Sequence, residues 1–100
     1  GVEQAVSSHP DISDCAVIGV PDEKWGERPR AYVTLRPEAR GGDESALEEA
    51  VIAYCRAHIA GYKVPRDVRI LDELPRTSTG KVRKNELREE AWAGHEQKIN

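Results

Sequence analysis

Apolar residues recur along this chain at two different spacings, and each spacing predicts a different kind of element. In VEQAVSSHP, Val2 and Val6 lie four positions apart, which predicts a short helix that Pro10 prevents from continuing. DCAVIGVP (residues 14–21) is rich in β-branched side chains and predicts a buried strand. RAYVTL (residues 30–35) places an aliphatic residue at every second position and predicts a second strand beside the first.

A longer helix and a third strand are expected next. Ser45 and Glu48 form a Ser-x-x-Glu capping box, which predicts that a helix begins there and runs until Gly61 ends it. Apolar residues recur at helical spacing within it: Leu47, Val51, Ile52, Cys55 and Ile59. DVRILDEL (residues 67–74) alternates apolar and charged residues, which predicts a half-exposed strand with Leu74 on its apolar side.

The last expected element is a helix that begins near Arg83 and carries Leu87, Ala91 and Trp92 on one side. Together these elements predict an α+β fold, in which helices pack on a small sheet of about three main strands. At 100 residues, of which 38% are hydrophobic, the chain suits one domain, residues 1–100, with a single modest core. Gly1 opens the chain without a capping signal, so we expect a fragment of a larger protein.

Charge and hydropathy exclude several classes of protein. A formal net charge of −3 and a pI near 5.6 argue against a general nucleic-acid or membrane-surface binder, since those partners attract positively charged proteins. No apolar run approaches the roughly 20 residues that span a bilayer, and the N-terminus lacks a signal segment. We therefore expect a cytoplasmic protein with no nucleic-acid partner and no membrane span.

The cysteines and histidines show no pattern typical of metal or redox sites. Cys15 and Cys55 lack CxxC spacing and lie among apolar neighbours, so we interpret both as small buried hydrophobic residues. The histidines are scattered along the chain, and no metal site is predicted from them: His9, His58 and His95.

Candidate chemistry centres on LPRTSTGKVRKNELRE (residues 74–89). Hydroxyl side chains bond nearby backbone groups and glycine accepts left-handed dihedral angles, so Thr-Ser-Thr-Gly predicts a loop that presents Lys81. A phosphate-binding P-loop would need glycine in place of Pro75 and serine or threonine in place of Val82. These two differences exclude a P-loop here. A solvated surface lysine is the alternative, but a cation at a helix start opposes the helix dipole, and broken local rules often mark functional sites.

Three stretches resemble, in order, the C-terminal domain of the adenylate-forming (AMP-binding) superfamily, in its acyl-CoA synthetase branch. They are HPDISDCAVIGVPDEKWGERPRAYVTL, HIAGYKVPRDVRILDELPRTSTGK and VRKNELRE, and they cover nearly all of residues 2–90. The resemblance implies the mobile C-terminal lid of a ligase that makes an acyl-adenylate from a small carboxylic acid and ATP, and then a thioester with coenzyme A. ATP, Mg²⁺ and the acid would be bound by an N-terminal domain that this chain lacks.

The same resemblance implies roles for individual residues. Lys81 matches the lysine that enters the active site during adenylation. Two stretches match the face that contacts coenzyme A: Trp25 and Gly26 in a strand-connecting loop, and Tyr62, Lys63 and Arg66 after the long helix. There the aromatic rings would stack on the nucleotide or line the thiol channel, and the guanidinium would bind phosphate. From the residues alone, the indole could equally plug the edge of the core, and the second stretch could be an ordinary turn.

Three classes of function stay open at this point. The first is the lid of an acyl-CoA ligase, inactive as this fragment alone. The second is the equivalent part of a peptide-synthetase adenylation domain that serves a carrier protein, and the third is a free-standing binding or dimerisation module. The resemblance also implies a lysine acetyltransferase as a regulatory partner at Lys81. Lys84 departs from the arginine of many relatives, so the charge is kept but the bidentate fork is not.

Overall fold

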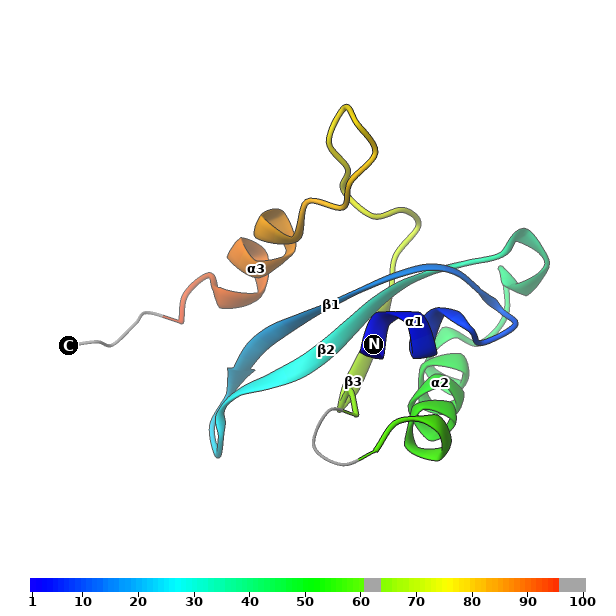
Figure 1. Ribbon diagram of the computed structural model, residues 1–100, viewed down its shortest axis with the longest axis horizontal. Helices are drawn as coiled ribbons and strands as arrows, with labels where there is room; N and C mark the ends of the chain where they lie inside the picture. The colour runs from blue at the N-terminus through cyan, green and yellow to red at the C-terminus, as the bar shows by residue number, and fades with distance from the viewer. Residues whose placement is uncertain (61–63, 96–100) are drawn as a thin grey trace.

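The structure is a computed structural model that describes residues 1–60 and 64–95. Helices lie on both faces of one small sheet (Figure 1), and the predicted α+β fold is confirmed. The elements are, in chain order, α1 (Val2–Ser7), β1 (Ile12–Asp22), β2 (Gly26–Leu35), η1 (Pro37–Ala39), α2 (Glu44–His58), β3 (Asp67–Ile70) and α3 (Lys84–Trp92).

The three-stranded sheet has the order β1-β2-β3 and mixes the two kinds of pairing. β1 and β2 form an antiparallel hairpin in which Cys15 lies opposite Val33. The predicted pair of neighbouring strands is therefore confirmed. β3 runs parallel to β2, with Asp67 opposite Arg30, and α2 lies in the connection because parallel strands require a long crossover.

The sheet separates two hydrophobic clusters, one on each face, so the expectation of a single core is wrong. The α1–α2 cluster consists of Val6, Ile12, Cys15, Ala31, Val33, Val51, Cys55 and Val68. The α3 cluster consists of Ala16, Ile18, Val20, Tyr32, Leu74 and Leu87. Because both faces of β2 are covered, residues 31–35 are all buried, and the alternation in RAYVTL sorts side chains between two clusters.

Helix α2 begins before the Ser45–Glu48 capping box that was expected to start it. Its N-cap is Asp43, whose backbone is extended (φ −81°, ψ 102°) and whose carboxylate accepts a hydrogen bond from the Ala46 N–H at 3.2 Å. A carboxylate also complements the positive end of the helix dipole, which favours Asp43 over Ser45. Glu48 instead accepts a hydrogen bond from the Ile70 N–H at 3.2 Å, and so ties α2 to β3.

The chain leaves the sheet after Ile70, so the prediction for Leu74 is wrong. Val68 packs into the α1–α2 cluster, whereas Leu74 packs into the α3 cluster on the opposite face. Strand pairing ends at β3, and the chain then crosses to the other side of the sheet. This crossing carries the segment that follows Leu74 toward α3, where the candidate lysine lies.

The shorter helices agree with the sequence predictions. α1 ends ahead of Pro10, and α3 buries Leu87 against the sheet. The indole N–H of Trp92 donates a hydrogen bond to the carbonyl oxygen of Gly19 in β1 at 2.9 Å, which fastens the end of α3 to the hairpin.

The end of α2 and the two cysteines can be compared with the sequence predictions. α2 ends at His58, before Gly61, which lies outside the described residues. Cys15 and Cys55 are buried free thiols, as predicted, and burial raises the pKa of Cys15 to about 12.

In the part of the chain that the structure describes, no helix is both long and apolar enough to cross a membrane.

Candidate functional site

Lys81 ends a loop, residues 76–81, that projects from the domain between β3 and α3 (Figure 1). Thr77 closes this loop twice: its N–H donates to the carbonyl oxygen of Lys81 at 2.8 Å, and its Oγ1 accepts from the Lys81 N–H at 3.1 Å. The Gly80 N–H donates to the carbonyl oxygen of Thr77 at 2.9 Å, with a φ of 92° that glycine tolerates best. The predicted turn chemistry is confirmed.

The position of Lys81 relative to α3 corrects the argument from the helix dipole. α3 begins at Lys84 with Arg83 as its N-cap, so Lys81 lies before the first helical turn. The cations that do stand at the helix start have acidic partners. Lys84 Nζ lies 2.7 Å from Glu3 Oε2, and Arg83 Nε lies 3.5 Å from Glu86 Oε2.

The side chain of Lys81 is exposed, and its ammonium group makes no hydrogen bond or ion pair with any residue in 1–60 or 64–95. The loop that carries it has a closed internal hydrogen-bond frame, so its backbone shape does not depend on a partner. A cation that has no partner among the described residues, on a loop whose backbone is held by its own hydrogen bonds, suits a group that acts on a ligand outside the domain.

Glu3 joins the start of α3 to the rest of the domain. Its Oε2 atom accepts hydrogen bonds from Lys84 Nζ and from the Val17 N–H, both at 2.7 Å. Burial alone would raise the pKa of Glu3, but the hydrogen bonds from Lys84 and Val17, together with the Lys84 charge, lower the pKa below its ordinary value of 4.5. Lys84 therefore has a structural contact of its own.

The turn between β1 and β2 carries Trp25, and Figure 1 shows this turn and the Lys81 loop at different ends of the domain. The Trp25 N–H donates to Asp22 Oδ2 at 2.7 Å, and Gly26 has a φ of 85°, which allows the chain to reverse into β2. The indole is 62% exposed, so the alternative that it plugs the edge of the core is wrong. Lys24 Nζ lies 5.1 Å from the centroid of the ring.

Trp25 and Arg66 meet at one pocket of about 350 Å³, although they are far apart in the sequence. The Arg66 N–H donates to the carbonyl oxygen of Pro29 at 3.1 Å, which places the residues before β3 beside the first half of β2. The pocket is lined by Trp25, Glu27, Arg28, Pro29 and Arg66.

The two arginines of this pocket differ in how they are bound. Arg28 Nη2 lies 3.1 Å from Asp67 Oδ2 and Arg28 Nη1 lies 3.5 Å from Asp22 Oδ1, so two carboxylates offset its charge. Arg66 is exposed and forms no ion pair within the described residues. A free guanidinium beside an exposed indole can bind a phosphate while the ring stacks on a base.

The structure therefore separates the residues singled out in the sequence. Trp25 and Arg66 share a pocket, Gly26 shapes the turn beside it, and Lys81 stands elsewhere. Tyr62 and Lys63 lie outside the described residues. Sequence reasoning missed Arg28, which lines the pocket, and Arg76, which lies in the Lys81 loop; each pairs with a carboxylate that is distant in the chain, Asp67 for Arg28 and Asp14 for Arg76.

Comparison with known families decides what kind of domain this is. Residues 1–81 match the sequence model of the AMP-binding enzyme C-terminal domain. The chain belongs to this family. The family match runs through both stretches that form the pocket and ends at Lys81, while α3 follows it.

Relatives in this AMP-binding family include enzymes named as CoA ligases. The chain is 47% identical, over 89% of its length, to the 3-[(3aS,4S,7aS)-7a-methyl-1,5-dioxo-octahydro-1H-inden-4-yl]propanoyl:CoA ligase of Rhodococcus jostii. It is 46% identical, over 90% of its length, to the 2-methylpropanoate–CoA ligase CCL4 of Humulus lupulus. It spans 16% of each of these relatives.

A solved structure agrees with the relatives in this family. The acyl-CoA synthetase of Brucella canis is similar over 95% of this chain and 17% of that chain, with a TM-score of 0.82 and 32% identity. The fold, the family match and the named relatives all agree with the acyl-CoA synthetase branch that the sequence resembles.

Proposed function

We propose that residues 1–100 form the C-terminal lid of an AMP-forming acyl-CoA synthetase that joins a small carboxylic acid to coenzyme A in two steps. In the first step, a carboxylate oxygen attacks the α-phosphorus of ATP, which forms the acyl-adenylate and releases pyrophosphate. In the second step, the coenzyme A thiol loses its proton to solvent, its sulfur attacks the acyl carbon, and the bond from that carbon to the phosphate oxygen breaks, so AMP leaves with the bonding electrons. The matched CoA ligases support this reaction class.

The observation that carries the proposal is the Lys81 ammonium, which has no partner among residues 1–60 and 64–95, at the end of a closed loop in a chain of this family. Negative charge develops on the oxygens of the α-phosphate and on the leaving pyrophosphate as the carboxylate oxygen attacks. A cation that is already positioned stabilises this charge more in the transition state than in the ground state, which is the condition for catalysis. Lys81 therefore acts in the first step.

The pocket formed by Trp25 and Arg66 acts in the second step. Coenzyme A carries an adenine ring and several phosphates, and the pocket offers an exposed indole and the Arg66 guanidinium, which forms no ion pair in the described part of the chain. Gly26 keeps the turn in shape, and Tyr62 and Lys63, which lie outside the described residues, are proposed from the sequence alone to bind coenzyme A as well. Because the β1–β2 turn that carries Trp25 and the Lys81 loop lie at different ends of the domain (Figure 1), we propose that the domain rotates to present each in turn.

The remaining substrates are bound by the rest of the protein. An N-terminal domain holds ATP, Mg²⁺ and the carboxylic acid, and this chain supplies one catalytic cation and part of the coenzyme A face. The exposure of Lys81 also makes it accessible to a lysine acetyltransferase, which would remove the charge.

The whole protein, tested for both half reactions, decides the proposal. We expect acid-dependent exchange of labelled pyrophosphate into ATP, and formation of AMP together with a thioester when coenzyme A is added. The domain of residues 1–100 is the control and should catalyse neither step, because it lacks the groups that bind ATP and the acid. Formation of ADP, or pyrophosphate exchange by the isolated domain, would contradict the proposal.

A further inference from the structure

We propose that Arg76 and Asp14 form a positioning pair that fixes the orientation of Lys81 for adenylation. The inference rests on the proposed function, since it assigns a support to the lysine that acts in the first step. Arg76 itself touches no substrate in this account and acts through Lys81.

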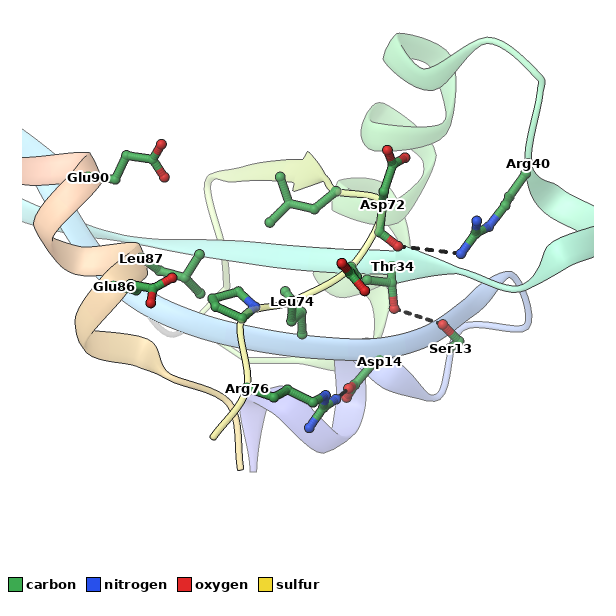
Figure 2. Close-up of a pocket in the computed structure, with 13 residues that line it drawn as sticks. Ser13, Asp14, Thr34, Arg40, Asp72, Leu74, Arg76, Glu86, Leu87 and Glu90 are labelled. Carbon is green, nitrogen blue, oxygen red and sulfur yellow. Dashed lines mark hydrogen bonds and ion pairs between the residues drawn. The ribbon is translucent and has the colours of Figure 1, made fainter. Parts of the chain in front are cut away.

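One guanidinium makes both contacts of this pair. Arg76 Nη1 donates to the carbonyl oxygen of Gly80 at 2.5 Å, directly before Lys81, and Arg76 Nη2 pairs with the carboxylate of Asp14 in β1 (Figure 2). The planar fork of arginine suits this double role, because its nitrogens point in fixed directions from one rigid group. The backbone directly before Lys81 is thus joined to β1 through the side chain of Arg76.

Asp14 is itself held in place. Its Oδ1 atom accepts a hydrogen bond from the Cys15 N–H at 2.9 Å, and Cys15 belongs to the buried part of β1. Asp14 and Arg76 also lie in the wall of a pocket of about 750 Å³ between the sheet and α3 (Figure 2), where their side chains are 37% and 41% exposed. The pair is therefore partly shielded from solvent and is anchored to a rigid strand.

The other hydrogen bonds of residues 76–81 stay inside the loop. Thr77 bonds to Lys81, Gly80 and Thr79, and none of these bonds reaches the sheet. At the base, Arg76 and Val82 form an isolated bridge that closes the loop. Among the side chains of the described residues, Arg76 alone joins the loop to β1 by an ion pair or hydrogen bond.

This arrangement assigns separate tasks to Thr77 and Arg76. Without the Arg76 side chain the loop would keep the hydrogen bonds of Thr77, but it would lose the bond to Gly80 and could pivot about its base relative to the sheet. A catalytic group displaced by about 1 Å can lose about 100-fold in rate. Loss of Arg76 should therefore lower the rate of adenylation while the ATP and coenzyme A sites stay intact.

The first test uses the full-length enzyme with Arg76→Ala and Arg76→Lys. Arg76→Ala should lower kcat for acid-dependent pyrophosphate exchange about 10- to 100-fold, with near-normal thioester formation from supplied acyl-adenylate. Arg76→Lys keeps the ion pair but loses the fork, so it should lose less. Arg83→Ala is the matched control, because this arginine follows the same loop, is exposed, and its side chain pairs with Glu86 alone among the described residues; it should behave as the wild type. Equal loss in both half reactions with a lowered melting temperature would overturn the proposal in favour of a purely structural role.

A double-mutant cycle with Lys81→Ala completes the test. If Arg76 acts through Lys81, then Arg76→Ala should cause no further loss of exchange in the Lys81→Ala background. Losses that multiply would overturn the positioning role while leaving the role of Lys81 in place. If Lys81→Ala alone leaves adenylation unchanged, the proposed function of Lys81 fails, and this inference fails with it.

Discussion

Replacing Arg66 with alanine tests the proposed role of its pocket in coenzyme A binding, with little disturbance of the domain. The guanidinium is exposed and unpaired in the described part of the chain, and the only bond of Arg66 there is made by its backbone N–H, which the substitution retains. The free energy of unfolding should therefore change by no more than about 0.5 kcal/mol. A hydrogen bond to a charged group contributes about 1.5 to 3 kcal/mol, so KM for coenzyme A should rise roughly 10- to 150-fold.

Trp25→Ala should act on the same substrate through a different contact. The indole is 62% exposed, so its removal leaves no cavity in either hydrophobic cluster. Stacking of a base on an aromatic ring contributes about 1 to 3 kcal/mol, which corresponds to a rise in KM of roughly 5- to 150-fold. Both variants should thus weaken the use of coenzyme A by similar amounts.

The assay follows thioester formation by the full-length enzyme while coenzyme A and ATP are titrated separately. Pyrophosphate exchange should be unchanged in both variants, because adenylation uses the other end of the domain. Arg69→Ala is the matched control, since Arg69 is an exposed arginine of β3 that does not line the pocket. A raised KM for ATP with an unchanged KM for coenzyme A would refute the assignment, and so would an equal loss in the Arg69 variant.

Two further predictions concern Glu3, which pairs with Lys84 at the start of α3, and Lys81 itself. The pKa of Glu3 is lowered in the folded state, so its contribution to stability is present above its ordinary pKa of 4.5 and is lost as the pH falls through the lowered value. The urea midpoints of the wild-type domain and Glu3→Gln should therefore differ near pH 7 and converge toward about pH 3; a constant difference would contradict the link to Glu3. Full acetylation of Lys81 should abolish pyrophosphate exchange in the whole enzyme because it removes the charge, and a normal exchange rate in protein shown to be acetylated by mass spectrometry would count against this role.

Local patterns predicted most of the elements because they report local physics. The spacing of Val2 and Val6, the β-branched run of β1 and the apolar side of α3 each depend on residues close together in the chain, and each element was found. The start of α2 was misplaced because two residues can cap one helix. The carboxylate of Asp43 suits the N-cap better because it complements the positive end of the helix dipole. The Ser-x-x-Glu pattern two residues later favoured Ser45 instead.

Long-range features were out of reach of the sequence pattern. No pattern among neighbouring residues predicts that β3 pairs parallel with β2, or that Leu74 packs on the opposite face from Val68. The candidate site shows the same limit. The turn around Lys81 was predicted from its own residues, whereas the shared pocket of Trp25 and Arg66 and the contact of Arg76 with Asp14 join segments that only the fold brings together.

The central claim is that Lys81 acts in adenylation alone, and one variant of the full-length enzyme tests it most directly. Lys81→Ala should lower acid-dependent pyrophosphate exchange by about 100- to 1,000-fold, the usual loss when a preorganised group at a developing negative charge is removed. The same protein, supplied with acyl-adenylate and coenzyme A, should form thioester at a near-normal rate, because the proposal gives Lys81 no part in the second step. Equal loss in both half reactions, or no loss in either, would contradict the account.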